Sequence, residues 1–161
     1  MFFTFLSVCT TAELLQIPLT LDTTRTVTIP AGNTRFEETI TVKPSDDPDF
    51  QKYLDKIKGY TIESVSFSAN NAILNSGLVE APNKVIAYIE VEFPANNFVT
   101  AQSELLHDGK DINLGLTGDQ LAKMAESIQK NGSMQMRVFV NSKSFYGKFD
   151  LKVKINLKAK L

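Results

Sequence analysis

The C-terminal end of the chain alternates between apolar and polar side chains with almost no interruption. Successive side chains of a β-strand point to opposite faces, so a period of two indicates a strand with one face in a core and the other in water. The apolar set is Phe145, Phe149, Leu151, Val153, Ile155, Leu157, Ala159 and Leu161. The polar set is Lys148, Asp150, Lys152, Lys154, Asn156, Lys158 and Lys160. Residues 145 to 161 therefore predict one long strand within a sheet that covers a core.

The chain is large enough for one domain. It has 161 residues, of which 43% are hydrophobic, and this suits a single domain with a substantial core. We assign residues 13 to 161 to one β-sandwich domain, and residues 1 to 12 to the remnant of a signal peptide or an apolar N-terminal tail. The formal net charge of -1 supplies no general attraction to nucleic acid or to an anionic membrane. We therefore expect no nucleic-acid partner.

Further strands follow from the same period of two. Residues 15 to 21 and 27 to 29 predict two short strands separated by a turn at residues 22 to 24, and residues 36 to 42 predict a third. In residues 60 to 69 the apolar positions change from even to odd, which indicates a β-bulge near Glu63 or Ser64. Residues 85 to 93 form the next strand. Residues 134 to 140 then predict a hairpin with the C-terminal strand, while residues 95 to 111 have little pattern.

Two segments have a helical pattern instead. Ser45 to Pro48 offers polar capping residues and a proline before an apolar face made of Phe50, Tyr53, Leu54 and Ile57, with Gly59 as the stop. The second helix has Asp119 as its expected cap. Its apolar stripe is Leu121, Met124, Ala125 and Ile128, and Asn131-Gly132 ends it.

Seven or eight strands with two short helices as connections favour a mainly β fold, because an α/β fold needs a helix after nearly every strand. We predict an immunoglobulin-like antiparallel β-sandwich with Greek-key connections. A partly closed antiparallel barrel is the alternative.

The single cysteine lies near the N-terminus. Leu6-Ser7-Val8-Cys9 is similar to the lipobox of bacterial lipoproteins, in which a cysteine after a short apolar stretch is acylated; Val8 stands where Gly or Ala is usual, and the basic start of a signal peptide is absent. As an alternative, residues 2 to 8 form a first strand or an apolar tail and Cys9 is an ordinary buried thiol. One cysteine permits no intrachain disulfide.

The order of features along the chain resembles small, uncharacterised β-sandwich lipoproteins exported by Gram-negative bacteria. The resemblance is carried by Cys9, by residues 25 to 30, by the segment Asp47 to Tyr53 leading to residues 62 to 67, and by the strand Phe149 to Val153. It implies an extracytoplasmic address, with membrane attachment only through a lipid on Cys9 at the outer membrane or cell surface, and a non-catalytic role. It identifies no ligand and no site residues.

The sequence offers little for catalysis or metal binding. His107 is the only histidine, and no nucleophile motif, phosphate loop or dinucleotide fingerprint accompanies it, so we expect neither an enzyme nor a cofactor. One His and one Cys cannot supply the usual zinc ligands. Asp46, Asp47 and Asp49 suggest either calcium ligands or, more simply, caps of the following helix. Glutamates at 37, 38, 90 and 92 suggest glycosidase acids or ordinary surface pairs.

The basic face of the last strand, made of Lys148, Lys152, Lys154, Lys158 and Lys160, has two interpretations. It could meet an anionic glycan or an acidic partner, or its lysines could solubilise the surface and prevent edge-to-edge pairing of sheets. Glu90 and Glu92 on a neighbouring strand could neutralise part of it.

Two functions therefore remain. The first is an extracytoplasmic binding or adhesion module that presents the segments 70 to 83 and 94 to 111 to a protein or glycan at the cell envelope. The alternative is a structural or assembly subunit that docks through a sheet edge or the lysine-rich face, which an exposed apolar patch or an uncovered strand edge would favour. An enzyme ranks third.

Overall fold

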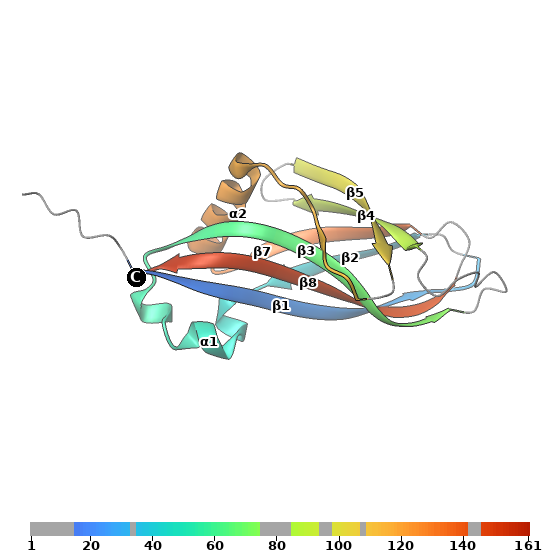
Figure 1. The fold of residues 1–161 in the computed structure, drawn as a ribbon, viewed down its shortest axis with the longest axis horizontal. Helices are drawn as coiled ribbons and strands as arrows, with labels where there is room; N and C mark the ends of the chain where they lie inside the picture. The colour runs from blue at the N-terminus through green and yellow to red at the C-terminus, as the bar shows by residue number, and fades with distance from the viewer. Residues whose placement is uncertain (1–14, 33–34, 75–84, 94–97, 107–108, 142–145) are drawn as a thin grey trace, which may run out of the picture.

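A computed structural model describes residues 15–32, 35–74, 85–93, 98–106, 109–141 and 146–161 (Figure 1). This part of the chain contains eight strands and two α-helices, together with two short 3-10 turns, η1 (Pro44–Asp46) and η2 (Leu54–Lys56). The helices are α1 (Pro48–Gln51) and α2 (Gly118–Asn131). The strands are β1 (Gln16–Ile29), β2 (Arg35–Val42), β3 (Gly59–Leu74), β4 (Val85–Phe93), β5 (Phe98–Leu106), β6 (Ile112–Asn113), β7 (Met134–Asn141) and β8 (Gly147–Lys160).

The strands form two four-stranded sheets, one in the order β1-β8-β3-β6 and the other in the order β2-β7-β4-β5. Every strand pairing within them is antiparallel. In Figure 1 the first sheet lies in front of the second, and the two short helices lie toward the end of the sandwich where β8 finishes. The predicted mainly β, antiparallel sandwich with two short helices is confirmed.

The C-terminal strand β8 lies inside its sheet, between β1 and β3. Its odd-numbered residues from Phe149 to Ala159 are all buried, with Ile155 and Leu157 fully inaccessible. They pack against the inner residues of β7, Met134, Met136, Val138 and Val140, in one continuous hydrophobic core. The alternation in the sequence therefore identified both the strand and the face that it buries.

The hairpin predicted between β7 and β8 is wrong, because these strands belong to different sheets. Both strands point their apolar faces into the same core, so they pack face to face across it. Sequence alternation determines which face of a strand is buried, but it does not determine which strand lies beside it. The connecting residues 142–145 lie outside the described part of the chain.

The turn predicted at residues 22 to 24 is also wrong, because β1 pairs with β8 in an unbroken register from Gln16 to Ile29. Threonines at 23 and 24 favour extended backbone, and the carboxylate of Asp22 lies 2.8 Å from the ammonium of Lys152 on β8. The polar residues that resemble a turn therefore belong to the solvent face of a long strand.

Two segments without a clear alternating pattern in the sequence contain strands. The strand β5 pairs with β4 within the segment 95 to 111, and β3 continues to Leu74 through a register shift between Asn70 and Ile73. Asn71 has a φ of 52° at that shift. The bulge predicted near Glu63 is confirmed by a second shift between Ile62 and Ser64.

The first predicted helix is replaced by η1, α1 and η2 in succession. Asp47 caps α1, since its carboxylate accepts hydrogen bonds from the backbone N–H groups of Asp49 (2.8 Å) and Phe50 (3.3 Å). Phe50 is fully buried, whereas Leu54 is 37% exposed. Of the two, only Phe50 anchors this segment in the core. A regular helix that buries a whole apolar face is therefore not required here.

The second helix is present, but Thr117 rather than Asp119 is its cap. The Thr117 hydroxyl accepts from the Gln120 backbone N–H at 3.3 Å, and the Gln120 side-chain oxygen accepts from the Thr117 backbone N–H at 2.9 Å. Gly132 ends the helix with a φ of 66°. Met124, Ala125 and Ile128 of the predicted stripe are buried.

This reciprocal cap makes a testable difference between two neighbouring residues. Thr117→Ala should lower the free energy of unfolding by about 1 kcal/mol, because it leaves a first-turn N–H group without its acceptor. Asp119→Ala should cost less, since Asp119 contributes only a favourable charge near the start of the helix. Chemical denaturation of both variants measures the two costs, and a larger loss for Asp119→Ala would contradict the assignment of the cap.

Candidate binding surfaces

A groove of about 410 Å³ runs between α2 and the first residues of β3. One wall is the edge of β3, and α2 provides the other; in Figure 1 the helix lies beside this part of the strand. The lining residues are Tyr60, Thr61 and Ile62 of β3, Gly118, Leu121, Ala122, Ala125, Glu126 and Gln129 of α2, and Lys160 of β8. The groove exists because β6, the next strand of the sheet, is very short: it pairs with β3 at Ser66 and Phe67, and no other described strand pairs with this edge of β3 nearer to Gly59.

The backbone of β3 is directed into this groove at two residues. Alternate residues of an antiparallel strand turn both their N–H and C=O groups to the same neighbour. The hydrogen bond from Leu161 N to Leu15 O (2.9 Å) shows that the odd-numbered residues of β8 turn toward β1. Tyr60 and Ile62 lie opposite Ala159 and Leu157, so their backbone groups turn away from β8. The same rule agrees with the bond from Leu114 N to Val65 O (3.0 Å), because Val65 lies opposite Ile155.

The side of α2 that lines the groove projects little into it, because Gly118, Ala122 and Ala125 have small side chains or none. Leu121 is half-buried and packs against the core. At the other end, the side-chain amide of Gln129 donates to the Lys58 carbonyl at 3.1 Å and ties α2 to the start of β3. The groove is therefore closed near Gly59 and apolar along its middle.

Tyr60 places a phenol at this groove. Its ring centroid lies 6.2 Å from that of the buried Phe50, and burial raises the pKa of its hydroxyl above the ordinary value of 10.0. Desolvation disfavours the phenolate, so Tyr60 remains a protonated group that can both donate and accept a hydrogen bond at neutral pH.

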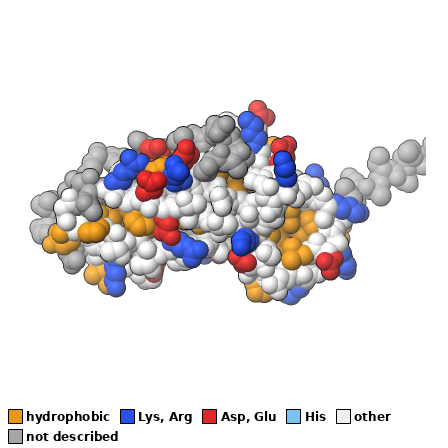
Figure 2. Space-filling model, turned by 180° about the vertical axis from the view of Figure 1, so that it is seen from behind, with side chains coloured by type: hydrophobic (Ala, Val, Ile, Leu, Met, Phe, Trp, Pro, Cys, Tyr) orange, Lys and Arg blue, Asp and Glu red, His pale blue; other side chains and the backbone are white. Residues whose placement is uncertain are grey.

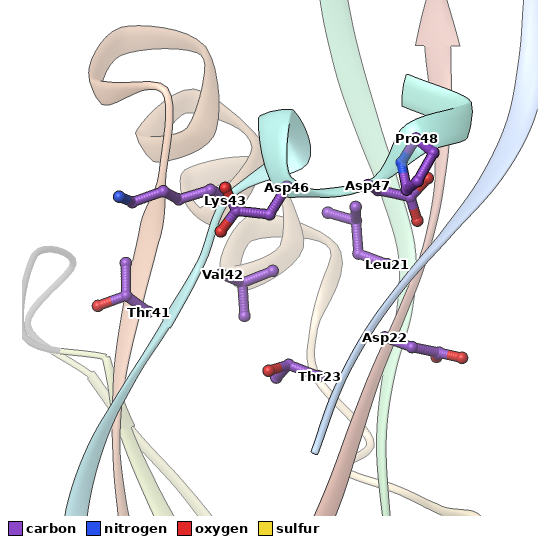
Figure 3. Close-up of a pocket in the computed structure, with 9 residues that line it drawn as sticks. All are labelled: Leu21, Asp22, Thr23, Thr41, Val42, Lys43, Asp46, Asp47 and Pro48. Atoms are coloured by element: carbon purple, nitrogen blue, oxygen red, sulfur yellow. The ribbon is translucent and has the colours of Figure 1, made fainter. Parts of the chain in front are cut away.

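A second, more polar hollow of about 210 Å³ lies between β1 and the end of β2 (Figure 3). It is lined by Leu21, Asp22 and Thr23 of β1, by Thr41, Val42 and Lys43, and by Asp46, Asp47 and Pro48 at the start of the helical segment. Asp22 pairs with Lys152, Asp47 caps α1, and the nearby Asp49 pairs with Lys52 at 2.6 Å. These three carboxylates have separate partners, and within the described residues no group of His, Cys, Asp or Glu is arranged to hold a metal ion.

The basic face occupies the solvent side of the sheet that contains β1, β8 and β3. Because β8 lies between two strands, its lysines do not protect a sheet edge, and that part of the interpretation is wrong. Acidic residues of β1 and β3, and Asp111 just before β6, neutralise much of the face: Lys152 pairs with Asp22, Lys154 with Asp111 at 3.2 Å, and Lys158 with Glu63. Lys148 and Lys160, at the two ends of the row, have no ion pair within the described residues. The structure therefore gives no continuous positive stripe.

Asp150 interrupts this basic row and connects three strands. Its carboxylate accepts a hydrogen bond from the Asn71 side chain of β3 and one from the Thr26 hydroxyl of β1, each at 2.8 Å. These bonds stabilise the ionised form of Asp150 and so hold its pKa below the ordinary value of 3.8. The bond from Asn71 has the larger effect.

The lowered pKa of Asp150 gives a pH-dependent prediction. A carboxyl group with a lower pKa in the folded state stabilises the fold above its ordinary pKa, and that contribution is lost as the pH falls through the lowered pKa. Carboxyl-detected NMR titration should find the Asp150 pKa below the ordinary value of 3.8, and Asn71→Ala should raise it. An unchanged pKa in Asn71→Ala would show that this hydrogen bond is not its main cause.

Three of the four glutamates considered as glycosidase acids, Glu37, Glu38 and Glu92, lie in ion pairs. Arg137 on β7 lies 3.4 Å from Glu37 of β2 and 3.1 Å from Glu92 of β4, and the Arg35 guanidinium lies 4.5 Å from the centre of the Phe139 ring. Figure 2, seen from behind, shows basic and acidic side chains mixed over the surface. Glu92 therefore neutralises Arg137 on its own sheet, and the expectation that it would neutralise the lysine face is wrong.

Several sequence predictions fall outside the described residues. These are Cys9 with the lipobox-like segment, His107, and residues 75 to 83 of the segment 70 to 83. Gly109, which follows Asp108, has a φ of 76°, as a tight turn requires. Among the helices described, none has the length and hydrophobicity needed to span a membrane.

Comparison with known proteins gives structural likeness only. No protein-family model matches the chain, and no curated protein matches its sequence. A decameric BFDV capsid protein is similar to it with 10% identity and a TM-score of 0.46, over 91% of this chain and 100% of the other. A maize chlorotic mottle virus structure has 9% identity and a TM-score of 0.36, covering 90% and 93% of the two chains. For Desmodium yellow mottle tymovirus the identity is 11% and the TM-score 0.34, with coverages of 90% and 84%.

Proposed function

We propose that this protein is a non-enzymatic binding module whose ligand lies in the groove between α2 and β3. The observation that supports this most is the stretch of the β3 edge at Tyr60 and Ile62, which has no strand partner among the described residues and opens into a hollow of about 410 Å³. A concave site that combines an apolar floor with a few directed polar groups is the usual form of a binding site. We also propose that the sandwich is of the immunoglobulin-like type.

Blocking the groove tests this function. Ala122→Trp places an indole on the exposed helical wall of the groove, whereas Lys123→Trp places the same side chain on α2 at a residue that does not line it. Arrays of glycans and of peptides should retain their bound members with Lys123→Trp and lose them with Ala122→Trp, provided that circular dichroism shows both variants folded. Ligands bound equally by both variants would place the site elsewhere.

We propose an extracytoplasmic address with a lipid anchor at Cys9, on the strength of the lipobox-like sequence. When the protein is produced in a Gram-negative host, mass spectrometry of the membrane fraction should find a mature chain that begins at an acylated Cys9. An intact Met1 with an unmodified Cys9 in the cytoplasm would contradict both the anchor and the address.

A structural or assembly subunit is the second candidate, and the edge of β1 favours it. Among the described residues, this strand pairs with β8 alone, and its even-numbered residues, which turn their backbone groups away from β8, are exposed from Gln16 to Thr28. Pro18 occupies one of these positions, where the N–H that it lacks would face outward. An unpaired edge of this length is a template for another strand.

The edge of β1 can be tested at Thr24. Thr24→Pro removes one outward N–H group without removing a hydrogen bond to β8, and Thr24→Val retains the N–H as its control. If the edge mediates assembly, light scattering should show oligomers for the parent protein and Thr24→Val and smaller species for Thr24→Pro. A monomeric parent protein at all concentrations would contradict self-assembly through β1.

A further inference from the structure

We infer that the ligand of the groove is an extended peptide that adds a strand to the edge of β3, with a carboxylate beside Lys160 and an apolar side chain over Leu121 and Ala122. This inference rests on the proposed binding function and specifies its ligand. Peptides bind in this way when an open sheet edge supplies main-chain hydrogen bonds and neighbouring pockets select alternate side chains.

The backbone of β3 supports a peptide more strongly than a glycan. Tyr60 and Ile62 each turn one N–H and one C=O toward the groove, and two residues along a strand lie about 6.6 Å apart. Only another extended backbone presents donors and acceptors in pairs at that same repeat. The bulge after Ile62 interrupts the ladder, so the added strand pairs with Tyr60 and Ile62 and ends at Glu63.

The helical wall determines which side chain of the peptide is accepted. Gly118 and Ala122 leave space above the half-buried Leu121, because neither has a side chain larger than a methyl group. A side chain of the added strand that points toward α2 therefore meets apolar surface. A valine or leucine there would remove that surface from water, which favours binding.

Charge determines which end of the groove accepts a carboxylate. Lys160 lines the groove near its closed end, and its ammonium has no ion pair within the described residues. Gly59, the residue opposite Lys160 in β3, has no side chain, and the polar side-chain amide of Gln129 lies beside it at this end of the groove. A C-terminal carboxylate or an acidic side chain at this end complements it, whereas Glu126 on the facing helix disfavours a second negative charge.

A displayed library of random seven-residue peptides with free C termini is the probe. Selection against the full chain, with Ala122→Trp used to remove peptides bound elsewhere, should enrich sequences with one apolar residue and a carboxylate near one end. Lys160→Gln should weaken these peptides a few-fold, as expected for a partly exposed ion pair, and should not affect analogues in which that carboxylate is an amide.

Backbone methylation of a selected peptide distinguishes strand addition from other modes of binding. A methyl group on an amide nitrogen that donates to Tyr60 or Ile62 leaves a carbonyl of β3 unpaired, and should weaken binding by about tenfold or more. Methylation of the intervening amides, which point away from β3, should change the affinity less than about twofold. This control needs no change in the protein, so it cannot be confused with misfolding.

Four results would overturn the inference. If methylation at every position has the same effect, or if Lys123→Trp removes the peptides as completely as Ala122→Trp, no strand is added at β3. If only glycans are retained on the groove, the binding function stands and the peptide inference fails. If neither glycans nor peptides distinguish Ala122→Trp from Lys123→Trp, both fail.

Discussion

Ile155→Asp is expected to abolish folding. Ile155 is fully inaccessible at the centre of β8 and belongs to the hydrophobic core, and the buried polar residues of the described structure, Ser66, Ser68 and Ser127, include no basic group. An unpaired carboxylate in such a place costs several kcal/mol, which is comparable with the whole free energy of unfolding of a small domain. Circular dichroism and thermal melting should show the loss of the cooperative transition.

The neighbouring residue provides the control for this change. The Lys154 side chain lies on the solvent face and pairs with Asp111 at 3.2 Å, so Lys154→Gln removes only an exposed ion pair worth about 0 to 1 kcal/mol. Replacement by Asp is less suitable, because residue 154 lies opposite Asp22 in the strand register. Similar losses of stability for Ile155→Asp and Lys154→Gln would contradict the assignment of the odd-numbered face to the core.

The sequence pattern predicted those features of the fold that belong to a single strand, such as which of its faces is buried. The buried face of β8 and the bulge after Ile62 both follow from which positions are apolar, and burial enforces that choice. The pairing of β7 with β2 and β4 does not follow from it, because the backbone hydrogen bonds that join strands are the same for every residue except proline. The edge strand β5 has no clear alternation in the sequence, so neither the strand nor its place beside β4 was predicted.

The groove could not be predicted in the same way. It depends on the short length of β6 and on α2 lying beside the edge of β3, and neither relation is local in sequence. Tyr60 and Ile62 are recognisable as inward residues of a strand, but only the register with β8 shows that their backbone groups turn away from that strand. A sequence signal does exist on α2, where Gly118, Ala122 and Ala125 make one side of the helix unusually small.

Phe50→Ala should lower the free energy of unfolding by about 3 to 5 kcal/mol, the usual cost of removing a fully buried phenylalanine. The sequence placed Phe50 and Leu54 on one apolar face, but Phe50 is inaccessible and Leu54 is 37% exposed. Leu54→Ala is therefore the matched control and should cost less than about 1 kcal/mol, because exposed positions contribute little. Phe50 also packs near Tyr60, so its loss should weaken peptide binding at the groove even in solutions where the domain remains folded. Chemical denaturation measures both losses of the free energy of unfolding. Equal losses would mean that the segment from Pro48 to Ile57 packs as the regular helix expected from its sequence. They would also mean that α1 does not depend on Phe50 as its single anchor.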